Sequence, residues 1–318
     1  MKFLEKLIKK QHIMQRILGL NLKQFNLLVK QLEPHWEKMR LQKITVGRKR
    51  KIGGGRPYKF EALEHKVAIV LLYYKLYMTQ EFLGIVVDLD QANVSRLLKK
   101  LTPLIEKAAD PELMTYLAKA KEEYLKQSPY ERINNWREFL KKHPDLKDIS
   151  TDATEQKCFR SKDNKQQQEY YSGKKKQHSL KKQISISAAG RILDVSKTYP
   201  GSVHDKSILD QEKTIQKFPQ KTAQRFDSGY QGALQDNPDY YVILPIKKPR
   251  GGELSKLGKE HNQVHSRRRV VVENKFAQIK SFRICGNLYR GPVKSHDQTF
   301  RNVAAIINFR SATSAIIV

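Results

Sequence analysis

The sequence predicts an α+β protein, in which a helical N-terminal part precedes a domain of mixed strands and helices. Two observations support this prediction. Apolar residues recur at helical spacing near the N-terminus, whereas after residue 148 short segments alternate apolar and polar side chains. In that second part a strand, a hairpin, a helix, two strands and a further helix follow one another, which is typical of a mixed sheet flanked by helices.

The composition indicates the class of partner. The chain has 318 residues, with 61 Lys and Arg against 32 Asp and Glu and a formal net charge of +29. Such an imbalance in a sequence that is 39% hydrophobic indicates a polyanion, and it favours nucleic acid over an acidic membrane surface. The two cysteines exclude a disulfide scaffold and a CxxC-type zinc site. No signal peptide or membrane-spanning run is recognisable, so we expect an intracellular protein.

Residues 1–60 are expected to form a helical segment followed by a basic arm. Apolar residues recur there at four- and three-residue intervals, as on one face of a helix: Leu18, Leu22, Phe25, Val29 and Leu32. Residues 38–60 then contain nine Lys or Arg and no acid, with three consecutive glycines. This stretch fits either a solvated linker or an arm that follows DNA phosphates.

Residues 61–110 predict a helix-turn-helix. After a helix over 62–75, Thr79 is placed to cap a second helix, and residues 88–90 separate it from a third. Apolar side chains of the last two helices are expected to pack together: Phe82, Leu83, Val86, Val94, Leu97 and Leu98. Polar residues are left on a face free to enter a major groove: Gln91, Asn93, Ser95 and Arg96. The alternative is an ordinary pair of short helices, which many helical domains contain.

Residues 111–148 are expected to be a helical connector, and residues 149–318 a separate domain. Strands are predicted in the second domain over 149–153, 182–187, 191–196, 223–227 and 240–245, with a glycine turn closing the hairpin at Gly190. Helices are predicted over 206–216 and 265–282.

Three acids stand out by their placement in these elements. Asp152 and Asp227 end predicted strands, and Glu273 lies on the last predicted helix. Carboxylates so placed can converge on one point, where they would repel one another unless a divalent cation is bound. Mg²⁺ and Mn²⁺ prefer such oxygen ligands, and two such ions stabilise the attacking and leaving oxygens of a phosphodiester displacement. The acids therefore predict a two-ion site for cutting nucleic acid.

The last helix carries further charges beside Glu273. Arg269 and Lys280 are four and seven residues from it, so the three side chains share one helical face. Such a face can hold a metal and bind flanking phosphates together. On spacing alone, it fits equally a solvated face of ion pairs.

Histidines offer weaker signals. His204 and Asp205 fit a cap of the helix that begins near residue 206, or a supporting role near the metals. His178 fits a position on the sheet or a phosphate contact. His261 and His265 could hold zinc only with a third ligand, which the sequence does not provide.

Several motifs resemble the DDE transposases of bacterial insertion sequences, and most closely the fifth insertion-sequence family, which is related to the Harbinger elements of eukaryotes. The resemblance lies in the runs 171–180, 190–195 and 200–205, in Asp227-Ser228-Gly229-Tyr230, and in Arg269-x3-Glu273-x6-Lys280. Asp152-Ala153-Thr154 resembles the first catalytic motif of the family, in which glycine usually stands where this chain has Ala153. Ser266 stands where the fuller signature often has Tyr.

The resemblance implies an RNase H-like catalytic domain over 149–318, with Asp152, Asp227 and Glu273 as the catalytic, metal-binding acids. It implies two Mg²⁺ or Mn²⁺ ions, with Arg269 and Lys280 on the DNA phosphates. The implied partners are the terminal inverted repeats of the element and a target duplex, bound by a homodimer or a higher oligomer. The implied location is the bacterial cytoplasm, in association with the nucleoid. Two alternatives remain open: a non-catalytic DNA-binding regulator, and a metal-dependent nuclease without strand transfer.

Overall fold

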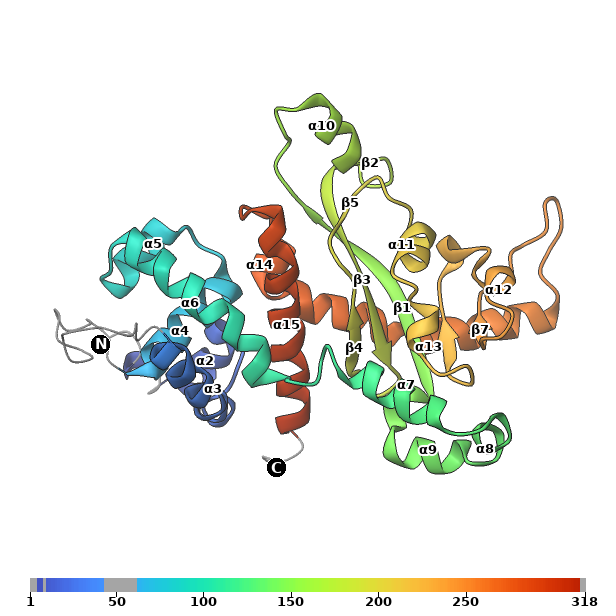
Figure 1. Cartoon of the computed structure of the whole chain (residues 1–318). Coiled ribbons are helices and arrows are strands. Elements are labelled where there is room, and N and C mark those ends of the chain that lie inside the picture. The colour runs from blue at the N-terminus through green and yellow to red at the C-terminus, as the bar shows by residue number, and fades with distance from the viewer. Residues whose placement is uncertain (1–4, 8–9, 43–61, 315–318) are drawn as a thin grey trace. The chain divides into compact units, whose positions relative to one another are not determined.

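The computed structural model describes residues 5–7, 10–42 and 62–314. The chain divides into two compact units (Figure 1). A helical unit contains Met1–Pro111, Ile279–Asn287 and Gln298–Val318, and an α/β unit contains Glu112–Gln278 and Leu288–Asp297. The end of the chain therefore packs with its beginning, which differs from the continuous 149–318 domain that the sequence suggests. Most of the basic arm over 38–60 lies outside the described residues.

The helical unit is built around a helix whose middle is buried on all sides. Its helices are α2 (Gln11–Leu18), α3 (Leu22–Gln42), α4 (Leu63–Leu76), α5 (Gln80–Val87), α6 (Gln91–Ala109), α14 (Arg283–Gly286) and most of α15 (Val293–Ser314). In α4 six consecutive residues, from Val67 to Leu72, are buried, so all sides of this helix are covered. Asn302 of α15 links the helices, since its amide donates to the hydroxyl of Tyr74 and to the carbonyl of Thr102.

Helices α5 and α6 are joined by three residues, as the sequence predicts. The Thr79 hydroxyl accepts a hydrogen bond from the backbone N–H of Phe82 and so caps α5. Gly84 is required at this turn, because a Cβ there would lie 2.4 Å from the carbonyl oxygen of Leu89. Leu83 and Val94 are buried as expected. Phe82 is not, since it is 55% exposed and its predicted packing against α6 is wrong.

The α/β unit contains one mixed sheet in the order β2-β3-β1-β6-β7. Its central strands β1 (Asp148–Lys157) and β3 (Gln177–Ser187) pair antiparallel over nine residues each. On the other edge of β1, β6 (Ala223–Arg225) runs parallel to it, and β7 (Val242–Ile243) runs parallel to β6.

The free edge of β3 is shared by three short strands. From its beginning to its end, β3 pairs with β2 (Tyr171–Ser172), β5 (Tyr199–Pro200) and β4 (Ile192–Val195). Strands β3 and β4 form the predicted hairpin, with Gly190 at φ 87° in its turn. His178 lies on the sheet, where it pairs with Tyr171, and this confirms the first of its two interpretations.

Helices cover both faces of this sheet. One face packs on α7 (Tyr116–Lys126), α9 (Trp136–Lys142) and α11 (Asp205–Gln211). The remaining short helices of this unit are α8 (Pro129–Asn134), α10 (Asn164–Tyr170), α12 (Ala233–Asp236) and the 3₁₀ turns. A buried cluster joins the first helices to the sheet: Leu117, Ala120, Tyr124, Phe139, Leu146, Ile149, Leu193 and Phe218. The opposite face is contacted by α13 (Lys256–Lys280), which begins nine residues before its predicted start.

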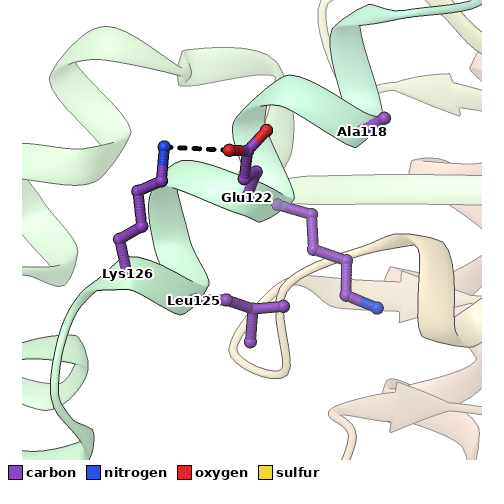
Figure 2. Close-up of a pocket in the computed structure, with 5 residues that line it drawn as sticks. Ala118, Glu122, Leu125 and Lys126 are labelled. Atoms are coloured by element: carbon purple, nitrogen blue, oxygen red, sulfur yellow. Dashed lines mark ion pairs between the residues drawn. The ribbon is translucent and has the colours of Figure 1, made fainter.

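Figure 2 shows a pocket on the outer side of α7, lined by Ala118, Lys121, Glu122, Leu125 and Lys126. Within it Lys126 and Glu122 form an ion pair of 2.9 Å between two largely exposed side chains. None of the acids predicted for catalysis lines this pocket. Among the described residues, no helix is long and apolar enough to cross a membrane.

Candidate active site

The first predicted acid, Asp152, lies on β1, and the second, Asp227, lies two residues beyond the end of β6, the parallel neighbour of β1. Asp148 of β1 pairs with Ala223 of β6, and Ser150 pairs with Arg225. Asp152 follows Ser150 by two residues, and Asp227 follows Arg225 by two residues. Extending the strand register by two residues therefore sets the two acids opposite each other. Because side chains alternate between the faces of a sheet, both carboxylates leave on the face opposite to Ile149.

Asp152 lies in a partly buried, mainly acidic environment. Burial raises its pKa to about 6, with further increases from Asp227 and Asp205, while Arg269 and the backbone N–H of Ala153 act in the opposite direction. Nη2 of Arg269 donates to Oδ2 of Asp152 at 2.6 Å, and the backbone N–H of Ala153 donates to Oδ1 at 2.7 Å. Because burial disfavours its charged form, the Asp152 carboxylate is stabilised by a positive charge placed nearby.

Asp227 is held by the turn that follows β6. It precedes the short 3₁₀ helix η3 (Ser228–Tyr230), and its Oδ1 accepts from the backbone N–H of Gly229 at 2.7 Å. A Cβ at Gly229 would lie 3.0 Å from Oδ1 of Asp227 and 3.7 Å from Oδ2 of Asp205. The carboxylates of Asp227 and Asp205 therefore both lie next to Gly229. Asp205 is thus a third acid of this cluster, besides Asp152 and Asp227.

Asp205 is fixed from the sheet by a buried lysine. Nζ of Lys181 on β3 lies 3.0 Å from Oδ1 of Asp205 and donates to the carbonyl of Val203 at 2.7 Å. The same ammonium lies 3.8 Å from Glu155, whose other oxygen accepts from the hydroxyl of Ser179. Lys181 is 7% exposed, so its charge is directed toward these acids rather than toward solvent.

The predicted capping role of His204 and Asp205 is only partly seen. Helix α11 begins at Asp205, one residue before the expected position, and His204 occupies its N-cap without a side-chain capping hydrogen bond. Asp205 lies in the first turn, where the helix dipole favours a negative charge. Its contact with Lys181 was not predicted, because Lys181 comes from a distant strand. The run Pro200-Gly201-Ser202-Val203-His204-Asp205, noted for its resemblance, was the available signal.

Tyr230 lies close to the three aspartates. Its side chain is fully buried, and its hydroxyl donates to Oε1 of Gln183 at 3.2 Å. Burial raises its pKa well above the usual value, and Asp205, Asp152 and Asp227 raise it further. The ring packs in an apolar cluster with Leu209, Ile215, Phe226, Ala233 and Val242. This cluster gives the end of β6 a rigid support.

Helix α13 contributes the remaining predicted residues. Arg269 is the residue of α13 that contacts Asp152, and Glu273 follows one turn later on the same helical face. Glu273 is exposed and forms no hydrogen bond or ion pair with a described residue. Lys280 ends the helix, is exposed and belongs to the helical unit. In the described part of the chain, no three His, Cys, Asp or Glu side chains are arranged to hold a metal ion as they stand.

The two histidines of α13 attach the helix to the sheet. Nε2 of His261 lies 3.0 Å from the carbonyl oxygen of Leu244, and His265 is hydrogen-bonded to the backbone of Ile243. Burial lowers the pKa of His265, and Arg269 lowers it further. Their rings stack with centroids 6.2 Å apart.

The predicted DNA-reading residues lie at the start of α6. Gln91, Asn93 and Arg96 are exposed, and Ser95 is half-buried. Their contacts are local: Gln91 donates to Gln80 at 3.1 Å, and Arg96 donates to Asn93 at 2.8 Å. Gln91, Asn93 and Arg96 are therefore presented to solvent at the start of α6.

Comparison with known proteins gives the family of this chain. Residues 151–308 match the family described as DDE superfamily endonuclease, a segment that includes Asp152, Asp227 and Glu273. The chain is 28% identical over 268 residues to the "Probable transposase for insertion sequence element IS702" of Microchaete diplosiphon, covering 84% of this chain and 87% of that protein. No solved structure matches the chain significantly. The chain belongs to the DDE transposases.

Proposed function

We propose that this protein binds the ends of an insertion sequence, cuts the DNA there with the help of divalent metal ions, and joins the freed strand to a target duplex. The observation that carries this proposal is that Asp152 on β1 lies near Asp227, just beyond the parallel strand β6, with Asp205 and Arg269 beside them. Two partly buried carboxylates close together are a donor set suited to Mg²⁺ or Mn²⁺.

The charge and the atom type of these donors match this class of metal. Asp152 has a raised pKa because burial and two neighbouring acids disfavour its charge, and Arg269 is the one cation in contact with it among the described residues. All available donors are carboxylate oxygens, as hard divalent cations require. The residues fit Mg²⁺ or Mn²⁺, which would be held by Asp152, Asp227 and Glu273. When bound, the ions would activate the attacking oxygen and stabilise the leaving one.

The protein groups would position the DNA around this centre. Asp152 and Asp227 are held rigidly by β1, β6 and the Tyr230 cluster, so their oxygens are preorganised. Glu273 would complete the donor set from α13, after a change of side-chain conformation. Arg269 would then release Asp152 and bind the scissile phosphate, and Lys280 would bind a neighbouring phosphate.

The strand order supports an RNase H-like domain. Strands β4, β3 and β1 form an antiparallel succession, and β6 and β7 extend it as parallel strands. The acids of an RNase H-like nuclease are expected on the central strand and near the end of its parallel neighbour; Asp152 lies on β1, and Asp227 follows β6 by two residues. We also propose that α5 and α6 read the ends of the element through Gln91, Asn93, Ser95 and Arg96.

The decisive experiment measures cleavage of a duplex that carries one end of the element and its flanking DNA, with Mg²⁺ or with EDTA. The variants are Asp152→Asn, Asp227→Asn and Glu273→Gln, with Asp239→Asn as an exposed control in the same unit. We expect the three site variants to lose cleavage by at least about 10³-fold and the control to keep it, because each site variant removes charge that holds the metal. Full activity in Asp152→Asn and Asp227→Asn would refute the proposal.

The two alternatives give different results in the same assay. A non-catalytic regulator would bind the duplex without cutting it under any metal condition. A nuclease without strand transfer would cut the duplex but would not join a labelled 3′ end to a second DNA. The match to a transposase over most of both chains favours strand transfer.

A further inference from the structure

A basic excursion separates the two long strands of the sheet. Residues 158–176, here called the basic lobe, connect the end of β1 to the start of β3 and contain α10 and β2. Figure 1 shows α10 and β2 at one end of the β1–β3 pair, with α7, α8 and α9 at the other end of this unit. The lobe has six Lys or Arg and two acids.

Internal hydrogen bonds give the lobe a defined structure. Asp163 caps α10 by accepting from the backbone N–H of Gln166 at 2.8 Å, and Nε of Arg160 donates to Gln167 at 2.7 Å. Strand β2 pairs with the start of β3, and the intervening turn is fixed by a hydrogen bond from the backbone N–H of Lys175 to the hydroxyl of Ser172. This turn presents three consecutive lysines from a fixed hairpin.

The lysines of the lobe differ from four other lysines of the α/β unit, which are paired with acids. Lys181, Lys182, Lys206 and Lys217 each form an ion pair with Asp or Glu. By contrast, the lobe lysines are exposed and form no ion pair with a described residue: Lys162, Lys165, Lys174, Lys175 and Lys176. Their charge stabilises nothing within the unit and is available to an anionic partner.

Aromatic side chains accompany these lysines. Phe159 is 62% exposed at the start of the lobe, and Tyr171 is 41% exposed next to the lysine turn. Exposed rings among unpaired cations are typical of nucleic-acid surfaces, where a ring contacts sugars or bases while cations contact phosphates. The combination favours DNA over an acidic protein.

The direction of β1 gives the position of the lobe relative to the acids. Lys157, the last residue of β1, is five residues beyond Asp152. At about 3.3 Å per residue, this is about 17 Å, or about five base pairs at 3.4 Å each. We infer that the basic lobe binds the DNA backbone about five base pairs from the cut bond. This inference rests on the proposed function for the identity of the DNA.

The test measures how DNA binding depends on salt, using a fluorescent duplex of random sequence. The lobe variant carries Lys174→Gln, Lys175→Gln and Lys176→Gln. The control variant carries Lys126→Gln, Lys141→Gln and Lys142→Gln, which removes the same charge from exposed lysines of α7 and α9, each paired with a glutamate. Thermal unfolding of both variants verifies that they are folded.

We expect the slope of log K against log salt to fall by about 0.9 for each phosphate contact that the lobe variant loses. The control variant should keep the wild-type slope, and a Lys→Arg version of the lobe variant should keep it as well. Equal slopes for the lobe and control variants would overturn the inference.

A footprint on the element-end duplex tests the position of the contact. Wild-type protein should protect phosphates about five base pairs from the cut bond, and the lobe variant should lose that protection while keeping protection at the bond itself. Loss at the bond alone would contradict the assigned position. Metal-dependent cleavage by wild-type protein is measured in parallel, so a chain whose lobe binds DNA but which never cuts would refute the proposed function and not the lobe contact.

Discussion

The guanidinium of Arg269 lies 2.6 Å from the carboxylate of Asp152, although 117 positions separate the two residues in sequence. The contact joins α13 to the central strand at the acidic cluster. Arg269 thus supplies the positive charge beside Asp152 that a bound cation would otherwise supply. Several consequences of this arrangement can be measured.

Replacing Arg269 by Gln should destabilise the metal-free protein and be compensated by metal. The loss leaves Asp152 beside Asp227 and Asp205 without a cation, at a cost of about 1–3 kcal/mol in the free energy of unfolding. Mn²⁺ should restore most of that loss. Arg225→Gln is the matched control, because it removes a similar ion pair with Asp148 on the same face of the sheet. Urea unfolding in EDTA and in Mn²⁺ should show recovery only for Arg269→Gln.

Gly201 should tolerate no side chain. A Cβ there would lie 2.2 Å from Oγ of Ser179 and 3.0 Å from the backbone oxygens of Ser179 and Tyr170. We expect Gly201→Ala to lower the free energy of unfolding by about 1–3 kcal/mol and to reduce cleavage, because the segment it distorts leads to Asp205. Gly173→Ala, which has open space around it, should be neutral. Equal stability of the two variants in urea would contradict this account.

His296 should make the protein less stable in acid. Its side chain is 1% exposed, and burial lowers its pKa to about 3 from 6.5, with a further decrease from Lys182. Between these values the unfolded chain binds a proton that the folded chain does not, so stability falls as pH falls. This group should contribute up to about 1.4 kcal/mol per pH unit below pH 6.5. His296→Gln should flatten the stability profile between pH 6 and pH 4, measured by urea unfolding; an unchanged slope would exclude His296 as the source.

Arg96→Ala should weaken sequence recognition more than general DNA binding. Because Arg96 is exposed at the start of α6, its loss should reduce the preference for an element-end duplex over a random duplex by about 1–3 kcal/mol. Lys107→Ala, at the far end of the same helix, should leave the preference unchanged. Competition binding gives both values. A uniform loss on both duplexes would assign Arg96 to phosphate contact.

The sequence predicted the elements whose pattern is local. The α5–α6 turn follows from Thr79 and the Asp88-Leu89-Asp90 break, and the β3–β4 hairpin follows from alternation around Gly190. The family membership was also predicted, from the motifs around the acids and between them, and is confirmed. The metal-binding roles of Asp152, Asp227 and Glu273 stay predictions.

The features that were missed depend on distant partners. Strand β3 begins at Gln177, five residues before its predicted start, since Lys181 and Lys182 become buried beside Asp205 and Asp297. The local sequence pattern gives no signal of ion pairs between residues so far apart in the chain. Likewise, the polar first half of α13 lacks an apolar period and is held by hydrogen bonds from His261 and Asn262 to backbone groups near β7.

The parallel register of β1 and β6 has a consequence for how the length of this chain can vary. A deletion of one residue between Ser150 and Asp152 would rotate the carboxylate to the wrong side of the sheet. Additional residues in the excursion between β1 and β3 would leave both aspartates where they are, because strand pairing rather than chain length aligns them. The length of that excursion can therefore change without separating Asp152 from Asp227.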